Sequence, residues 1–331
     1  MPQDYQKARE WYLKAAEQGN PAAQFNLGWM FYYGKSVPRD YLKAREWFEK
    51  AAEQGQPDAP YALGVMHDTG QGVPKDCQKA REWFRKAAAR RHAGAQFALG
   101  MMYQNGRGVT RDYQQARGWF EKAAGQGYAD AQFALGVMYK LGLGVPKSQE
   151  KAFEWYRKAA EQGHAGAQNN LGAMYYKGEG VQKDFAAARA WYEKAAALGD
   201  ANAQSNLGGM YKNGHGVPQD YAKAAEWYRK SAERGHAGAQ NSLGDMYRKG
   251  QGVPQSYAHA LKWYLKSAGH GNANAQYSLG VMYENGQGVP KDRAKAAEWY
   301  QKAADQGHAA AKAHLRAMKK PVIKLITPTS A

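Results

Sequence analysis

Four histidines are the first residues in this chain whose type could support chemistry. They recur at one constant interval and are His92, His164, His236 and His308. If each interval holds two pairs of helices packed about 10 Å apart, successive histidines lie roughly 20 Å from one another. Zinc holds its ligands at about 2 Å. The spacing therefore excludes one metal site shared by the four histidines.

A serine and a cysteine are the other candidates for catalysis. Ser148 and Lys151 match the S-x-x-K motif of serine β-lactamases, but Ser148 stands just before a helical pattern, where serine commonly caps a helix. Cys77 takes a position that other segments fill with tyrosine, which favours a core substitution over a nucleophile. A single cysteine also excludes an intrachain disulfide framework. We find no phosphate-binding, zinc-protease or hydrolase motif, and we predict no catalytic residue, metal, cofactor or enzymatic activity.

A repeat of 36 residues must position everything else in the chain. Its most regular marker is a tryptophan, found at Trp11, Trp47, Trp83, Trp119, Trp155, Trp191, Trp227, Trp263 and Trp299. A Leu-Gly pair keeps the same interval, from Leu27-Gly28 to Leu279-Gly280. A fixed period of this size indicates an array of one supersecondary unit.

The segment 201–236 shows what one repeat contains. Its first helix places Ala203, Leu207, Met210 and Tyr211 on one arc, beside Gln204 and Gly208, while the opposite arc varies freely between repeats. A glycine inside a helix costs about 1 kcal/mol relative to alanine. The recurrence of Gly208 therefore predicts that a neighbouring helix comes too close for a side chain.

The second half of the repeat is a turn followed by a second helix. The turn is 214–218, and Asp220 is the expected N-cap. The second helix is predicted to bury Tyr221, Ala224, Trp227, Tyr228 and Ala232, and Gly235 is expected to end it as a left-handed C-cap. Neither helix buries its aromatic face alone, so the units must stack.

The repeated pattern A-x-A-Q-x-x-L-G-x-M-Y-x-x-G-x-G-V-P-x-D-Y-x-K-A-x-x-W-Y-x-K-A-A-x-x-G closely resembles the Sel-1-like repeat (SLR), a relative of the tetratricopeptide repeat. The resemblance covers residues 2–318. It implies an all-α fold, a right-handed α-α superhelical solenoid whose first helices line a concave groove. It also implies a scaffold or adaptor, as in bacterial envelope and host-interaction systems and in eukaryotic protein quality control. Some cysteine-rich relatives are described as β-lactamases, but their paired cysteines are absent from this chain.

The repeat limits predict a single solenoid over 1–318. It would contain a lone helix at 4–18, eight full repeats from 21 to 308, and a lone helix at 309–318, which makes 18 helices. The irregular tail 319–331 leaves the pattern. The chain begins in mid-repeat, so a longer precursor with its own leader stays open. The chain as it stands points to the cytoplasm, whereas a periplasmic or secreted location requires a removed leader.

The variable positions of the first helices divide the predicted groove. The position of residue 205 is aromatic in the first half of the chain and mostly small or polar in the second, and the position of residue 209 follows the same trend. Grouped apolar surface usually marks a binding site, and aromatic residues are favoured anchors. We predict that a protein or peptide is anchored in the groove by Phe25, Trp29, Tyr61, Phe97, Met101 and Phe133. The alternative is that Phe25 and Trp29 pack against the preceding helix or a missing unit.

A large share of the net charge of +17 comes from 75–117, which holds ten lysines and arginines and only three acidic residues. From this patch we expect Arg81, Arg85, Arg90 and Arg91 to attract acidic segments of the partner. Arg91 also stands where other repeats have the C-cap glycine, which predicts local strain. The alternative function is binding of polyanions or nucleic acid through 75–117, although no code of base-reading side chains recurs in the repeats.

A ladder of lysines completes the charge pattern, with one lysine three residues after each tryptophan of the repeat, as in Trp227 and Lys230. We predict that the lysines face solvent opposite the buried tryptophans. A glutamate four residues earlier, as in Glu226 and Lys230, predicts helical ion pairs.

Overall fold

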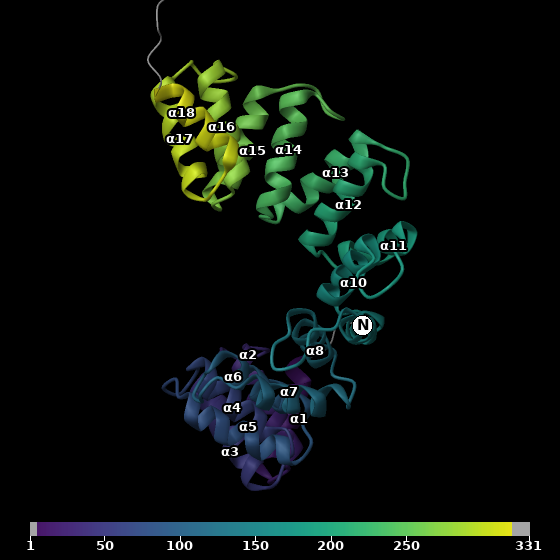
Figure 1. Cartoon of the computed structure of the whole chain (residues 1–331). Coiled ribbons are helices and arrows are strands. Elements are labelled where there is room, and N and C mark those ends of the chain that lie inside the picture. The colour runs from purple at the N-terminus through teal and green to yellow at the C-terminus, as the bar shows by residue number, and fades with distance from the viewer. Residues whose placement is uncertain (1–4, 320–331) are drawn as a thin grey trace, which may run out of the picture. The chain divides into compact units, whose positions relative to one another are not determined.

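The computed structural model describes the backbone of residues 5–319 and the side chains of 10–318, and Figure 1 shows the helices. The predicted tail therefore lies almost wholly outside the described residues. The described part contains no strand and the expected 18 helices. Their bounds are α1 Tyr5–Glu17, α2 Pro21–Tyr33, α3 Tyr41–Glu53, α4 Ala59–Thr69, α5 Cys77–Ala89, α6 Ala93–Asn105, α7 Tyr113–Ala124, α8 Ala129–Leu141, α9 Gln149–Glu161, α10 Ala165–Lys177, α11 Phe185–Ala197, α12 Ala201–Asn213, α13 Tyr221–Glu233, α14 Ala237–Lys249, α15 Tyr257–Gly269, α16 Ala273–Asn285, α17 Arg293–Asp305 and α18 Ala309–Lys319. This is an all-α repeat solenoid, as predicted.

The helices form two compact units. Unit 1 holds the chain up to Ala167 together with Glu179–Val181, and unit 2 holds Gln168–Gly178 and the chain from Gln182 onward. Inside each unit, first helices pack on the second helix of their own repeat, and those second helices pack on the next first helix. That residues 1–318 form one uninterrupted domain stays a prediction. Among the described residues, no helix has the length and apolar character needed to cross a bilayer.

The buried face of the first helix agrees with the sequence pattern. In α12, Ala203, Leu207 and Met210 are buried together with Gln204 and Gly208. Tyr211, at the edge of this face, is half-buried. The predicted close approach at the glycine is also confirmed, because a Cβ atom on Gly208 would lie 2.8 Å from the ring of Tyr228.

The predicted caps define both ends of the second helix. Asp220 accepts a hydrogen bond from the Lys223 amide at 2.9 Å. At the other end Gly235 has φ +87°, and the His236 amide bonds back to the Ser231 carbonyl at 3.2 Å, as in a Schellman motif. Ser148 likewise accepts from the Lys151 amide at 3.2 Å. This confirms that Ser148 is a helix cap.

Within a repeat, a glutamine on the first helix pairs with a glutamine just after the second helix, and we call this recurring pair the glutamine clasp. Gln96 is buried and donates to the Ala88 carbonyl at 3.4 Å. Gln126 in turn donates to the Gln96 side-chain oxygen at 2.8 Å. The same pairing joins Gln54 to Gln24, Gln162 to Gln132 and Gln306 to Gln276. A buried polar side chain is costly without partners. The bond from Gln96 to Ala88 therefore ties a repeat to the one before it, and the clasp ties the first helix of a repeat to the end of its second helix.

The lysine ladder does not lie opposite the tryptophans, and the prediction that it does is wrong. Trp227 is half-buried against the core of the preceding repeat, and Lys230 places Nζ 4.3 Å from the centre of its ring. The same pairing recurs from Lys50 to Lys302, with distances of 4.0 to 4.8 Å. Three residues turn a helix by about 300°, which returns to nearly the same face. The lysines therefore cover the tryptophans by cation–π contact.

The described ion pairs with a spacing of four residues use arginine, and the arginine precedes the glutamate. They join Arg45 to Glu49, Arg117 to Glu121, Arg157 to Glu161 and Arg189 to Glu193, at 3.5 to 3.9 Å. Lysines of the ladder such as Lys230 instead lie over a ring. The sequence reasoning chose the wrong partner for these lysines.

Candidate functional site

An apolar pocket lies between two first helices of unit 1, α6 and α8. Its volume is about 300 Å³, and Phe97, Met101, Phe133 and Val137 form much of its wall. Phe97 and Phe133 are one repeat apart, as are Met101 and Val137, so equivalent positions of neighbouring helices face the same space. Gln104, Asp130, Ala134 and His164 complete the lining. We call this the α6–α8 pocket.

The two phenylalanines divide their surface between the core and the pocket. Phe97 packs against Phe120 and Tyr128, with ring centroids 5.6 and 5.4 Å apart. Phe133 packs against Tyr156 at 5.7 Å and stacks on His164 at 4.5 Å. Both phenylalanines remain half-buried. Rings held in this way present a rigid apolar surface, so a ligand side chain would meet walls that are already ordered.

One edge of the α6–α8 pocket is polar. His164 Nε2 lies 3.3 Å from Asp130 Oδ1, and His164 Nδ1 accepts a hydrogen bond from the Ala167 amide at 3.0 Å. Asp130 keeps about half of its side chain exposed. The pocket therefore combines an apolar floor with a carboxylate at its rim. The anchor prediction missed Asp130, Val137 and His164, although the 36-residue spacing from Met101 to Val137 was a usable signal.

The structure places the other predicted aromatic anchors elsewhere in unit 1. Phe25 and Trp29, on α2, are half-buried and pack against Phe48, with centroids 5.7 and 5.0 Å away. Tyr61, on α4, stacks on His92 at 4.4 Å. These three residues do not line the α6–α8 pocket. Phe25 and Trp29 pack against a helix, but it is the following helix α3 and not the preceding helix that the alternative named.

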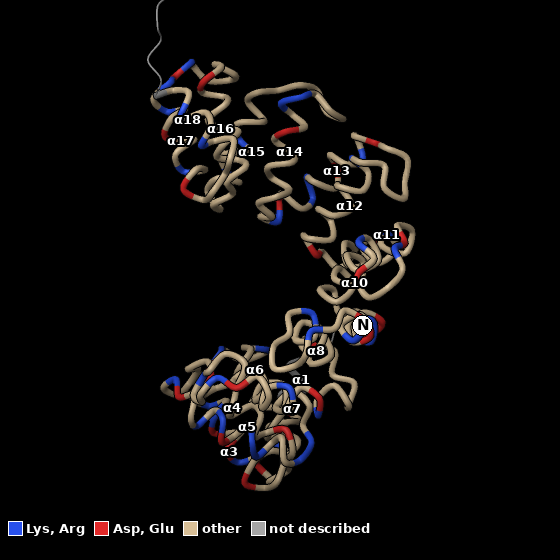
Figure 2. Tube along the Cα trace, in the orientation of Figure 1, with Lys and Arg blue, Asp and Glu red and all other residues tan. Residues whose placement is uncertain are grey.

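The four predicted arginines lie on or just after α5, and three of them bond within the chain. Arg81 donates to the Gly108 carbonyl at 3.4 Å, Arg85 to the Tyr103 hydroxyl at 3.2 Å and Arg90 to the Gly55 carbonyl at 2.9 Å. Arg91 is exposed. Figure 2 shows the basic positions along this part of the chain. None of the four lines the α6–α8 pocket, so the arginines and the aromatic anchors occupy different surfaces.

Arg91 has the strained backbone that the sequence predicted. Its φ is +63°, whereas the equivalent Gly55 and Gly127 have +82° and +83°. A left-handed conformation costs a residue with a Cβ atom roughly 1 kcal/mol more than it costs glycine. We expect Arg91→Gly to raise the free energy of unfolding by about that amount in urea titrations. Arg91→Lys, which keeps the charge and the strain, should give no gain. Equal stability of the two variants would contradict the strain.

The recurring histidines cap the first helices, a role that the sequence reasoning did not assign. Nδ1 accepts from the backbone amide three residues later, at 3.0 Å from His92 to Ala95 and 2.9 Å from His236 to Ala239. Asn20 and Asp200 do the same at equivalent positions. An accepting Nδ1 carries no proton, so this cap needs a neutral imidazole. In both His92 and His236, burial is the main cause that lowers the pKa below its usual 6.5.

The capping histidines predict a loss of stability in mild acid. Below about pH 6.5 the unfolded imidazole binds a proton, while the folded one resists it because its pKa is lower. The unfolded state therefore binds more protons, and stability falls as the pH drops from 6.5 through the folded pKa. We expect urea unfolding of His92→Asn/His236→Asn to show a smaller loss between pH 7.5 and 5.5 than the parent chain. An equal loss in both proteins would contradict titration of these caps.

Comparison with protein-family models gives a match over nearly the whole described chain. The Sel1 repeat model matches residues 1–20 and then every 36-residue segment from 21–56 to 273–308. The chain belongs to the Sel1 repeat family. The matched segments begin and end where the sequence spacing placed the repeats. Proteins with this scaffold commonly mediate protein–protein interaction and are typically non-catalytic.

Two solved Sel1-type structures resemble this Sel1 repeat chain. A Sel1 repeat protein from Oxalobacter formigenes is 34% identical, with a TM-score of 0.70 and an alignment covering 93% of this chain and 90% of that one. A protective antigen of uropathogenic Escherichia coli with an SLR fold is 37% identical, with a TM-score of 0.67 and coverage of 93% and 74%. Comparison with curated proteins gave no match.

Proposed function

We propose that this Sel1 repeat protein is a non-enzymatic scaffold that binds a protein or peptide at the first helices of unit 1. The observation that carries the proposal is the α6–α8 pocket. Its apolar wall is formed by Phe97, Met101 and Phe133, three of the six predicted anchors, and by Val137. Its volume of about 300 Å³ is at the lower end of ligand pockets. This suits one or two apolar side chains better than a large cofactor.

The packing around the pocket supports recognition without rearrangement. The rings of Phe97 and Phe133 are held from behind by Phe120 and Tyr156, so binding would cost little side-chain entropy. Asp130 at the rim would favour a partner with a donor or cation beside its apolar anchor. The arginines near α5 bond within the chain, so acidic flanks of a partner are a secondary expectation.

Site-specific cross-linking tests this function. A photoreactive amino acid would replace Val137 in one variant and Val281, at the equivalent position of α16, in another. After irradiation in lysate of the source organism, with and without nuclease, we expect a discrete protein adduct from position 137 only. Adducts with the same proteins from both positions would refute a specific pocket. Adducts that disappear on nuclease treatment would favour the polyanion alternative.

A further inference from the structure

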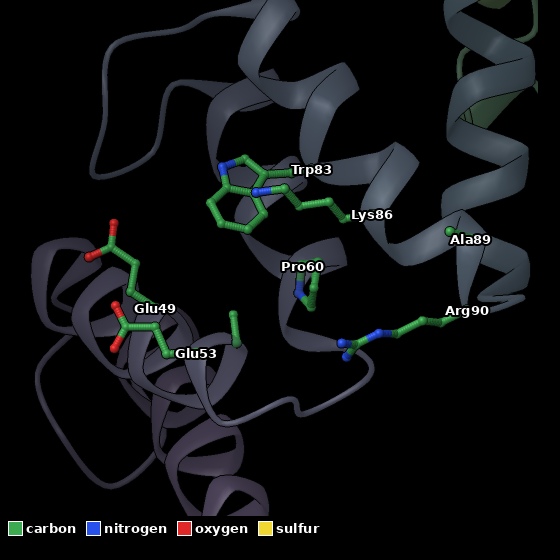
Figure 3. A pocket seen from close by; sticks show the side chains of 8 residues that line it. Glu49, Glu53, Pro60, Trp83, Lys86, Ala89 and Arg90 are labelled. Atoms are coloured by element: carbon green, nitrogen blue, oxygen red, sulfur yellow. The ribbon is translucent and has the colours of Figure 1, made fainter.

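A larger pocket lies on a different surface of unit 1, where the second helices α3 and α5 face each other across the start of α4. Its volume is about 650 Å³, and Glu49, Ala52, Glu53, Pro60, Trp83, Lys86, Ala89 and Arg90 line it. We call this the α3–α5 pocket (Figure 3). It shares no residue with the α6–α8 pocket, so an inference about it does not depend on the proposed function.

The α3–α5 pocket lies where this repeat lacks the glutamine clasp. Pro60 stands at the position of Gln96, and Arg90 stands at the position of Gln126. Proline has no side-chain donor, and Arg90 turns away to bond the Gly55 carbonyl. The side-chain pair found in the repeats 21–56, 93–128, 129–164 and 273–308 is therefore missing from 57–92. Three other repeats also lack the second glutamine, with Leu198, Arg234 and His270 in its place, but they keep the first glutamine. Among the eight full repeats, only 57–92 lacks both, because Pro60 replaces the first.

The walls of the α3–α5 pocket carry opposite charges. Glu49 and Glu53 extend from α3, whereas Lys86 and Arg90 come from α5 and the residue after it. In Figure 3 the two carboxylates lie on one side, and Lys86 lies across Trp83 on the other. Between them, Trp83, Pro60, Ala52 and Ala89 provide an apolar surface.

The charged groups keep capacity for a ligand. Among the described residues, Glu53 has no ion pair within 4.0 Å, and Arg90 makes one side-chain hydrogen bond, through Nη1. Lys86 Nζ lies 4.0 Å from the centre of the Trp83 ring, a contact that leaves its N–H donors able to bind an anion. Glu49 is 3.6 Å from Arg45 in an exposed pair, which is worth little energy. A ligand would therefore displace few existing interactions.

We propose that the α3–α5 pocket binds a short peptide with free ends. Its ammonium group would lie near Glu49 and Glu53, its carboxylate near Lys86 and Arg90, and an apolar side chain against Trp83 and Pro60. An extended chain spans about 3.3–3.6 Å per residue, so three residues reach about 10 Å. The volume lies well within the range of about 300–1,000 Å³ for small-molecule sites.

Isothermal titration of the full chain with the tripeptide Ala-Leu-Ala tests this proposal. We expect saturable binding of the free peptide and at least tenfold weaker binding of the acetylated and amidated form, which lacks both end charges. Absence of saturable binding at millimolar peptide would overturn the proposal. Equal binding of the capped peptide would do the same, because it would show that the charged walls contribute nothing.

Matched variants assign the binding to this pocket. Pro60→Gln/Arg90→Gln should restore the glutamine clasp, fill the opening and weaken binding at least tenfold, with no loss of thermal stability. Lys86→Ala should weaken binding, whereas Lys122→Ala, which removes the equivalent lysine over Trp119, should not. Unchanged binding by the clasp variant, or equal effects of the two lysine variants, would refute the site.

Discussion

Replacing Gly208 by alanine should destabilise unit 2, although alanine is the better helix former. An added Cβ would lie 2.8 Å from the Tyr228 ring, and that ring is buried at 6% exposure against the core. Overpacking of this kind costs about 1–3 kcal/mol. The gain in helix propensity of about 1 kcal/mol offsets only part of it.

The neighbouring residue provides the matched control. A Cβ atom on Gly209 would meet only the Tyr228 hydroxyl, at 3.6 Å, which is ordinary contact. Gly209→Ala should therefore gain helix propensity without a clash and become more stable. Because both variants gain the same propensity, the difference between their free energies of unfolding in urea measures the overpacking cost. Equal stabilisation of both would show that the Tyr228 ring moves aside freely.

Val137→Asp should reduce affinity for the cross-linked partner by about 30-fold or more. This corresponds to about 2 kcal/mol, the usual threshold for an interface hot spot. The change places a carboxylate in the apolar α6–α8 pocket, where a partner's side chain would have to desolvate it. The measurement is a titration of the identified partner with both proteins, alongside circular dichroism to verify folding.

The fold itself should accept this aspartate. Asp245 stands at the equivalent position of α14, where it accepts a hydrogen bond from Tyr264 at 2.6 Å and lies 3.8 Å from Arg248. Tyr156 and Lys140 have the same sequence offsets from Val137. The control variant is Gly209→Asp, at the equivalent position of α12, which should leave affinity unchanged. Equal affinity of the Val137→Asp protein and the parent would remove the pocket from the proposed interface.

The contacts of Phe25 and Trp29 change how those residues should be tested. Both rings pack against Phe48, which is fully buried. Truncating them to alanine would therefore disturb the core of α2 and α3 and would confuse lost binding with lost structure. Substitution of Met101 or Val137 avoids this problem, because both lie on the wall of a pocket.

The sequence by itself determined the repeat, its helices and its caps. These features are local to the chain. Asp220 accepts a hydrogen bond from an amide three residues later, and Gly235 ends the helix through its own left-handed backbone conformation. Gly208 was informative because glycine destabilises a helix. Its recurrence at the same position of each repeat therefore indicates that another helix packs closely there in every repeat. Periodicity repeats each such local signal eight or nine times, which makes the pattern unambiguous.

Only the tertiary structure decided what the side chains do between repeats. It placed Lys230 over Trp227, tied Arg81, Arg85 and Arg90 to acceptors 18 to 35 residues away, and brought Phe97 and Phe133 into one pocket. It also placed Pro60 and Arg90 in the lining of the α3–α5 pocket. Each outcome depends on which side chains two separate helices bring to the same space. Such a pocket has no local signal, because the residues that line it come from helices far apart in the chain.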